Sequence, residues 1–146
     1  GIDMNPWSRQ SAVARTDPNK AIRFITANIF DLPPSDKPDY IISSLFTHHL
    51  SDEELVQFII WMENTCQKGW FINDLHRHPV PYYFIGWIVR VLRLNRLVQH
   101  DAPVSVLRGF TRSDWLNLLN AAGLSPGSVE INWYWPFRYG IGRCKA

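Results

Sequence analysis

The sequence predicts an α/β fold with a largely parallel sheet that is closed by an antiparallel hairpin, and two observations carry that prediction. First, residues 39–50 and 70–74 are apolar runs that end on polar side chains, and a helical pattern lies between them. Strands that alternate with helices through short loops are typical of a parallel sheet. Second, residues 129–135 and 137–144 are two strand-like runs joined tightly at Pro136, and such neighbours pair antiparallel.

Composition and charge argue against several classes of function. The chain has 146 residues, enough for one domain with its own core, and its net charge of +2 is too small to indicate nucleic-acid binding. Cys66 and Cys144 lack the spacing of a zinc site or a disulfide framework, which favours a reducing cytoplasm. No signal peptide is recognised, and the longest apolar run, residues 80–92, contains Arg90 and is shorter than the roughly 20 residues of a membrane span. We therefore expect a cytoplasmic protein without a transmembrane segment.

The first part of the chain predicts two strands around a short helix. Residues 1–3 read as the end of a strand already under way, and residues 7–15 form a helix candidate for which Pro6 suits the first position. Residues 22–29 are rich in β-branched side chains and predict the second strand. The proline-rich residues 31–38 break it.

The central stretch, residues 39–50, predicts a buried strand that ends on polar side chains. Residues 40–42 are apolar without alternation, which suits a strand covered on both faces. Two serines and two histidines follow, namely Ser43, Ser44, His48 and His49. Since ligands bind at the carboxyl ends of strands in open α/β sheets, this end is a candidate site.

Capping residues mark the helices. Ser51, with Glu54 three residues on, predicts the start of a helix over residues 51–67, and Gly69 is a suitable stop. Residues 82–98 predict a very apolar helix that ends before a break at residues 101–103. The last helix has an N-cap, an acid three residues on and a glycine stop, at Thr111, Asp114 and Gly123.

In this order and spacing, four stretches resemble the class I S-adenosylmethionine (SAM)-dependent methyltransferases, in particular the small-molecule group with a strand-end His-His-Leu motif. The stretches are residues 1–3, 28–33 and 39–50, and residues 109–124 together with the closing hairpin. The resemblance implies a Rossmann-like sheet with a C-terminal antiparallel hairpin, SAM as the cofactor and a small-molecule acceptor.

One part of the family's pattern has no counterpart in this sequence, namely the glycine-rich loop on the first strand and helix. In the family that strand lies between the second and fourth strands, so its absence would leave a gap and an exposed edge. The resemblance therefore implies that residues 1–146 form an N-terminally truncated single domain without the first strand and helix. A homo-oligomer in which another copy fills the gap by strand exchange is the alternative.

The resemblance assigns six residues to the cofactor. Asp3, beside Met4, would accept both ribose hydroxyls, Asn28 would meet the adenine and Ile29 would pack on its face, while the methionine end would be lined by Ser44 and Leu45. An acid at a strand end equally suits a nicotinamide enzyme or a plain turn. Asn28 and Ile29 could instead be a loop amide and an ordinary core residue.

His48, His49 and Asp74 are the candidate catalytic residues. Imidazole titrates near neutrality, so either histidine could take the proton of an acceptor hydroxyl. Asp74, at the end of the next strand, could orient a histidine or the substrate. The alternative is that one histidine caps the following helix and the other is packed. His76 and His78 are a weaker version of the same idea, and no ligand spacing supports a metal there.

Residues 79–108 fall where the family often inserts a helical lid over the substrate. Their aromatic side chains would suit a flat, apolar acceptor. A core or dimer helix with a solvated arginine stripe is the favoured alternative, and a membrane-surface helix is the third, because Arg90, Arg93 and Arg96 oppose apolar residues.

Two functions from different classes follow. The first is a SAM-dependent methyltransferase that acts on a small, aromatic or lipid-like hydroxyl acceptor. The second is a non-catalytic remnant that serves as an oligomerisation or interaction module. The missing first strand favours the second function for this chain, and the polar strand ends favour the first function for the longer protein that the resemblance implies.

Overall fold

The computed structural model describes residues 1–31 and 37–145, which form two compact units, Gly1–Asp36 and Lys37–Ala146. The first unit holds a small parallel sheet of β1 (Ile2–Asp3) and β2 (Ile25–Thr26), with α1 (Pro6–Arg15) between them in the chain. The side chain of Asn5 caps α1 by accepting a hydrogen bond from the backbone of Trp7, and Pro6 begins the helix as predicted.

The predicted strand over residues 22–29 is too long. Only Ile25–Thr26 pairs as a strand, and a 3₁₀ turn, Ile29–Asp31, follows it. The side chain of Asn28 accepts a hydrogen bond from the backbone N–H of Phe30 at 3.1 Å, which starts that turn and ends the extended conformation. The prolines that we expected to break the strand lie mostly outside the described residues.

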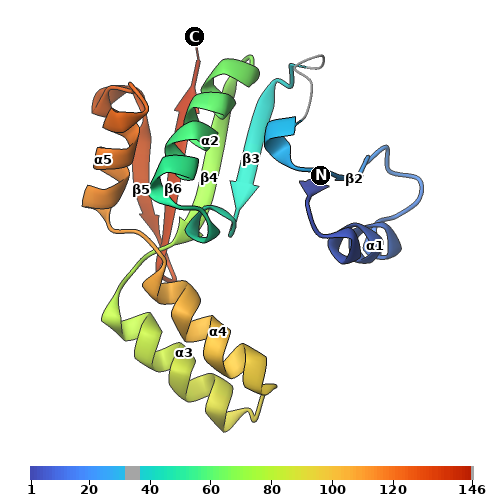
Figure 1. The fold of residues 1–146 in the computed structure, drawn as a ribbon, viewed down its shortest axis with the longest axis vertical. Coiled ribbons are helices and arrows are strands. Elements are labelled where there is room, and N and C mark those ends of the chain that lie inside the picture. Colours follow the sequence, from blue (N-terminus) through green and yellow to red (C-terminus); the bar gives the residue numbers. More distant parts are fainter. Residues whose placement is uncertain (32–36, 146) are drawn as a thin grey trace. The chain divides into compact units, whose positions relative to one another are not determined.

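The second unit is built on a four-stranded sheet in the order β3-β4-β6-β5 (Figure 1). Its strands are β3 (Tyr40–Ser44), β4 (Gly69–Leu75), β5 (Glu130–Tyr134) and β6 (Arg138–Cys144). β3 and β4 are parallel, whereas β6 is antiparallel to both β4 and β5. The predicted parallel pair and closing antiparallel hairpin are therefore confirmed.

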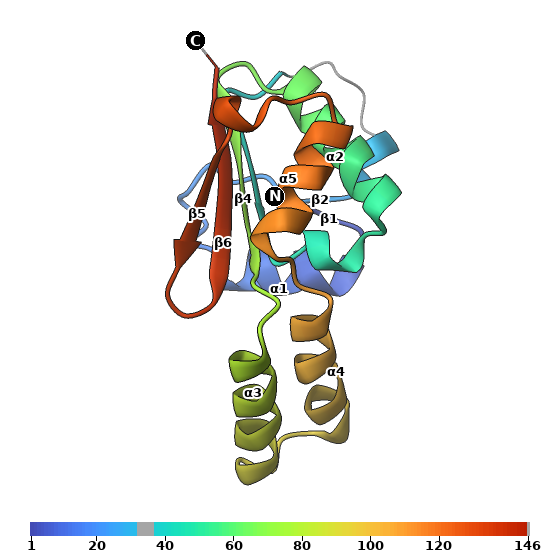
Figure 2. The ribbon, with the colours of Figure 1, turned by 90° about the vertical axis from the view of Figure 1, so that its left-hand side faces the viewer.

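Two helices, α2 (Asp52–Thr65) and α5 (Arg112–Ala121), lie on the same side of this sheet (Figure 2). Their inner faces and the sheet form the core. Its fully buried side chains include those of Leu55, Ile59, Met62, Ile72, Trp115, Leu119 and Ile141. The expectation that β3 is covered on both faces is wrong, because the side chain of Ile42 is 75 % exposed and that of Tyr40 58 % exposed. The apolar run at residues 40–42 thus leaves apolar surface on the face opposite the helices.

The capping boxes at Ser51 and Thr111 are confirmed, since each side chain accepts from the backbone three residues on and the acid there reaches back. Gly123 follows α5 in the left-handed conformation with φ of 77°, as a helix stop requires. The stop predicted at Gly69 is wrong, because α2 ends at Thr65 and Gly69 begins β4. A side chain at position 69 would collide with the backbone carbonyl of Arg143 on the neighbouring strand.

The segment between β4 and α5 forms a helical hairpin of α3 (Pro79–Val91) and α4 (Arg96–Leu107), rather than one helix over residues 82–98. The chain turns instead at Arg93, whose φ of 49° is left-handed. Pro103 does not break the chain but lies inside α4, where its ring faces Gly86 of α3. The packing of the two helices here outweighs the hydrogen bond that a proline removes. Among the described residues, no helix is long and apolar enough to cross a membrane.

Candidate active site

The candidate site in the second unit lies where β3 and β4 end. β3 ends at Ser44, and Leu45 then adopts a left-handed conformation with φ of 53° while its N–H donates to the carbonyl of Asn73 at 2.9 Å. A 3₁₀ turn, Thr47–His49, follows at once. Because the strands are parallel and Ser44 pairs with Asn73, this turn lies beside Asp74.

Asp74 is fully buried and its carboxylate is saturated with hydrogen bonds. One oxygen accepts from the backbone of Thr47 at 2.7 Å, from the hydroxyl of Thr47 at 2.5 Å and from the backbone of His48 at 3.2 Å. The other accepts from Nδ1 of His48 and from the backbone of Leu75, both at 2.7 Å. Burial raises the pKa of Asp74, but the hydrogen bonds from His48, Thr47 and Leu75 outweigh burial and leave that pKa below its ordinary value of 3.8. Asp74 is therefore ionised at neutral pH.

His48 is held in one tautomer by this carboxylate. An ionised carboxylate can only accept hydrogen bonds, so Nδ1 of His48 carries a proton and donates it across the 2.7 Å contact. In the neutral ring, Nε2 then carries a lone pair. Only 6 % of His48 is exposed, yet the residue lines a pocket, and Nε2 has no hydrogen-bond partner among the described residues. His48 is thus a fixed acceptor of protons at the pocket.

His49 lies beside His48, with ring centroids 4.1 Å apart, and its side chain is exposed. Burial, followed by the charges of His48 and Arg108, lowers the pKa of His49 below its ordinary value of 6.5, although Asp74 opposes them. His49 is consequently neutral at pH 7.

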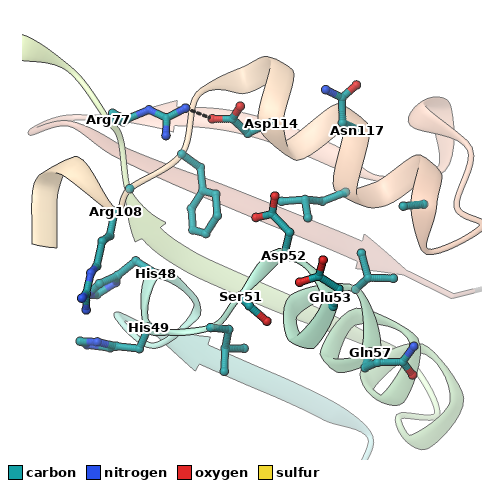
Figure 3. A pocket seen from close by; sticks show the side chains of 16 residues that line it. His48, His49, Ser51, Asp52, Glu53, Gln57, Arg77, Arg108, Asp114 and Asn117 are labelled. Atoms are coloured by element: carbon teal, nitrogen blue, oxygen red, sulfur yellow. Dashed lines mark hydrogen bonds and ion pairs between the residues drawn. The ribbon is translucent and has the colours of Figure 1, made fainter.

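Arg108 is the residue of this site that the sequence did not indicate. Figure 3 shows its side chain at the same end of the pocket as the two imidazoles. In the part of the chain that the structure describes, Arg108 forms no ion pair with a carboxylate. It reaches the strand ends because Gly109 packs against the backbone after β4, where an added Cβ would lie 2.7 Å from the carbonyl oxygen of Leu75.

The pocket itself has a volume of about 820 Å³ and runs between the starts of α2 and α5. Its lining includes Asp52 and Glu53 at the start of α2, a 2.6 Å ion pair between Arg77 and Asp114, and apolar side chains such as Leu118 (Figure 3). The structure therefore brings His48, His49 and Asp74 together, as the sequence predicted, and adds Arg108 to them.

The six predicted cofactor residues are divided between the two units. Ser44 and Leu45 lie in the second unit, at the strand end that carries the histidines, and the hydroxyl of Ser44 accepts from the side chain of Asn73 at 3.2 Å. The other four, Asp3, Met4, Asn28 and Ile29, lie in the first unit, where the pairing of Asp3 with Thr26 places them at one edge of the small sheet.

The carboxylate of Asp3 can accept hydrogen bonds from the hydroxyl groups of a ribose. One carboxylate oxygen of Asp3 accepts from the backbone of Asn5 at 2.7 Å, and the other has no hydrogen-bond partner among the described residues. Asp3 therefore keeps an acceptor for a hydroxyl. The side-chain oxygen of Asn28 accepts from the backbone of Phe30, and its NH2 group can donate to a base.

His76 and His78 do not join the site. Nδ1 of His76 accepts from the indole N–H of Trp133 at 3.2 Å, and Nδ1 of His78 accepts from the backbone of Val80 at 3.2 Å, which caps α3. Both rings also stack on Phe137. The described residues contain no group of three or more His, Cys, Asp or Glu side chains that could hold a metal ion.

No family model and no curated protein matches this chain, whereas solved structures do. Human N-acetylserotonin methyltransferase in complex with SAM is 16% identical with a TM-score of 0.63, over 99% of this chain and 39% of that one. A protein of Nostoc punctiforme PCC 73102, with a proposed O-methyltransferase activity, is 14% identical with a TM-score of 0.59, over 99% and 43%. Magnesium protoporphyrin IX methyltransferase of Synechocystis PCC 6803 with bound SAH is 13% identical with a TM-score of 0.50, over 84% and 51%.

This chain thus spans about two fifths to one half of the length of the structures it resembles. The parallel pair β3-β4, the antiparallel hairpin that closes the sheet and these three likenesses lead to one conclusion. The chain has the Rossmann-like fold of the class I SAM-dependent methyltransferases.

Proposed function

We propose that this chain provides the acceptor site and part of the cofactor site of a SAM-dependent methyltransferase that modifies a hydroxyl group of a small, aromatic or lipid-like molecule. The observation that supports this proposal best is the buried pair of His48 and Asp74 at the strand ends. A histidine that only capped a helix would not need a carboxylate saturated with five hydrogen bonds behind it.

His48 acts as the general base in this proposal. Its Nε2 accepts the proton of the acceptor hydroxyl, and the positive charge that develops on the ring lies 2.7 Å from the ionised carboxylate of Asp74. The same carboxylate fixes the orientation of the ring, so the lone pair is held in place before the acceptor arrives.

Arg108 and His49 complete the acceptor side. The guanidinium of Arg108 has no carboxylate partner in the described part of the chain, so it is available to stabilise the negative charge that grows on the acceptor oxygen. Its charge also helps to keep His49 neutral, which leaves His49 able to accept a hydrogen bond from the hydroxyl.

The cofactor residues that we propose in the first unit are Asp3, Met4, Asn28 and Ile29, and those in the second unit are Ser44 and Leu45. Bound there, SAM would supply a methyl group on a sulfonium, which needs no activation by an acid. The residues of this chain therefore have to position the hydroxyl and remove its proton. The human neighbour of this fold was solved with SAM, which supports the choice of cofactor.

A calorimetric titration of the 146-residue chain with S-adenosylhomocysteine tests the cofactor part of this proposal. We expect one-site binding, and we expect Asp3→Ala to weaken it by about tenfold or more, because a hydrogen bond to a charged group is lost. His48→Ala is the matched control and should leave the affinity unchanged. A chain that is folded by circular dichroism but binds no S-adenosylhomocysteine would contradict the proposal and favour a non-catalytic interaction module.

A further inference from the structure

The α3–α4 hairpin exposes a second apolar face that the core does not use. One face of α3 is buried and contains Pro81, Gly86 and Val89. The opposite face repeats at the helical spacing i, i+3, i+4, i+7 and i+11, and each of its side chains is more than half exposed, namely those of Val80, Tyr83, Phe84, Trp87 and Val91. A helix that is apolar on both faces needs a second apolar environment.

The turn of the hairpin is basic. Between residues 79 and 100 the only formally charged side chains are Arg90, Arg93 and Arg96, which surround the turn at the far end of α3. All three are exposed, and none forms an ion pair with any residue that the structure describes. Leu92 and Leu94, 60% and 40% exposed, lie between them.

We propose that this hairpin docks on the surface of an anionic lipid bilayer. Exposed aromatic and aliphatic side chains next to unpaired arginines are the features of interfacial helices, in which apolar groups enter the headgroup region and cations meet lipid phosphates. Tyr83 and Trp87 suit that boundary because each has an apolar ring and a polar atom.

The positive charge at the turn of the hairpin favours an anionic bilayer, rather than a second copy of the chain, as the partner of this surface. In a symmetric dimer the arginine clusters would approach each other, and the single acid of residues 79–107, Asp101, lies on α4 within 3.1 Å of the side chain of His100. The hairpin also extends beyond the end of the sheet at which β4 finishes (Figure 2). Its turn can therefore contact a flat surface before the sheet does. At 13 residues, α3 is too short to span the bilayer, so the hairpin lies in its interface.

Co-sedimentation of the full chain with vesicles tests this proposal. We expect binding to phosphatidylcholine vesicles that contain phosphatidylglycerol, little binding to phosphatidylcholine alone, and a loss of binding as salt is added. The triple variant R90E/R93E/R96E should lower the affinity on the order of 100-fold, since each arginine near such a surface contributes about fivefold. The charge-matched control R9E/R15E/R23E, at exposed positions of the first unit, should bind like the original chain.

A second variant separates the apolar contribution from the charge. Y83S/F84S/W87S removes exposed side chains only, so the fold should persist by circular dichroism while vesicle binding falls at least tenfold. Trp7→Ser, at an exposed tryptophan of α1, is its control. Equal losses in the two charge variants, equal binding to both vesicle types, or no vesicle binding would overturn the proposal. So would a dimer, seen by sedimentation velocity, that Y83S/F84S/W87S dissociates in place of vesicle binding. None of these readouts depends on methyl transfer.

Discussion

Two histidine clusters follow neighbouring parallel strands of this sheet, and their surroundings differ. After β3, His48 is buried and donates from Nδ1 to the carboxylate of Asp74. After β4, Nδ1 of His76 accepts from Trp133, and Nδ1 of His78 accepts from the backbone of Val80. In the neutral ring, these contacts place the proton on Nδ1 of His48 but on Nε2 of His76 and His78.

The difference shows that the hydrogen-bond partner of Nδ1 decides which nitrogen of a histidine can accept a proton. A carboxylate behind the ring leaves Nε2 of His48 free to accept a proton and stabilises the cation that results. The accepting nitrogens of His76 and His78 are used in structural hydrogen bonds, to Trp133 of β5 and to the backbone at the start of α3. Similar residues at similar strand ends thus have a free accepting nitrogen in one cluster and a bonded one in the other, and we propose a chemical role only for the first.

The largest expected effect is on the rate of methyl transfer, which should depend on the first histidine cluster and not on the second. His48→Ala should lower the rate of methyl transfer from labelled SAM to a hydroxyl acceptor by about 10²–10⁴-fold, because the general base is removed. His78→Ala should change that rate by less than about twofold and instead cost about 1 kcal/mol of helix capping. Both variants should bind S-adenosylhomocysteine like the original chain. A rate that His48→Ala leaves unaltered would remove His48 from the mechanism.

Next in size is the stability that Asp74 provides. Asp74→Ala leaves five buried donor contacts without an acceptor, and the free energy of unfolding in urea should fall by about 3–5 kcal/mol. Asp39→Ala removes an exposed carboxylate paired with Lys68 and should cost less than about 1 kcal/mol.

The contribution of Asp74 also has a defined dependence on pH. The folded-state pKa of Asp74 lies below 3.8, so its stabilisation is complete above pH 3.8 and is lost as the pH falls through that lower pKa. The difference between the original chain and Asp74→Asn in thermal unfolding should therefore shrink below pH 3.8. A difference that stays constant into that range would contradict the ionised state of Asp74.

Arg108 is the third point of comparison, because it forms no ion pair among the described residues, whereas the arginine of the second cluster, Arg77, is paired with Asp114 at 2.6 Å. Arg108→Gln should lower turnover by about tenfold, since one charge that stabilises the acceptor oxygen is lost. It should also raise the pKa of His49 toward 6.5, which an NMR titration of the imidazole measures. Arg112→Gln, at an exposed position of α5, is the control and should change neither quantity.

The smallest effect sharpens the structural role of the second cluster. Trp133→Phe keeps an aromatic ring but removes the N–H that donates to His76, so the free energy of unfolding should fall by about 0.5–1.5 kcal/mol. Methyl transfer should be unchanged. A loss of activity that matches the loss caused by His48→Ala would give His76 a part in the reaction.

Local signals explain what the sequence could predict. Ser51 with Glu54, and Thr111 with Asp114, are capping pairs within one helical turn, so their helices start where expected. The meeting of His48 with Asp74 followed from parallel strands that share an edge. The end of α2 was missed because the glycine at position 69 serves the close approach of β6, which is a contact between strands far apart in the chain.

Arg108 and the hairpin could not be predicted for the same reason. Arg108 reaches the histidines only after the chain has left the sheet, formed α3 and α4 and returned to the end of β4, and no spacing in the sequence records that path. Pro103 reads as a helix breaker until its contact with Gly86 is seen. The exposed face of β3 looks like a buried strand in sequence, because apolar residues without alternation carry no information on what covers them.

The most direct test of the central claim is a nitrogen NMR measurement of the histidine tautomers in the folded chain, at a pH at which the rings are neutral. We predict that His48 carries its proton on Nδ1 with Nε2 unprotonated, that His76 and His78 carry theirs on Nε2, and that Asp74→Asn abolishes the fixed state of His48 alone. A His48 ring protonated on Nε2, or one that exchanges between tautomers in the original chain, would contradict the account, because no lone pair would then be held ready for an acceptor hydroxyl.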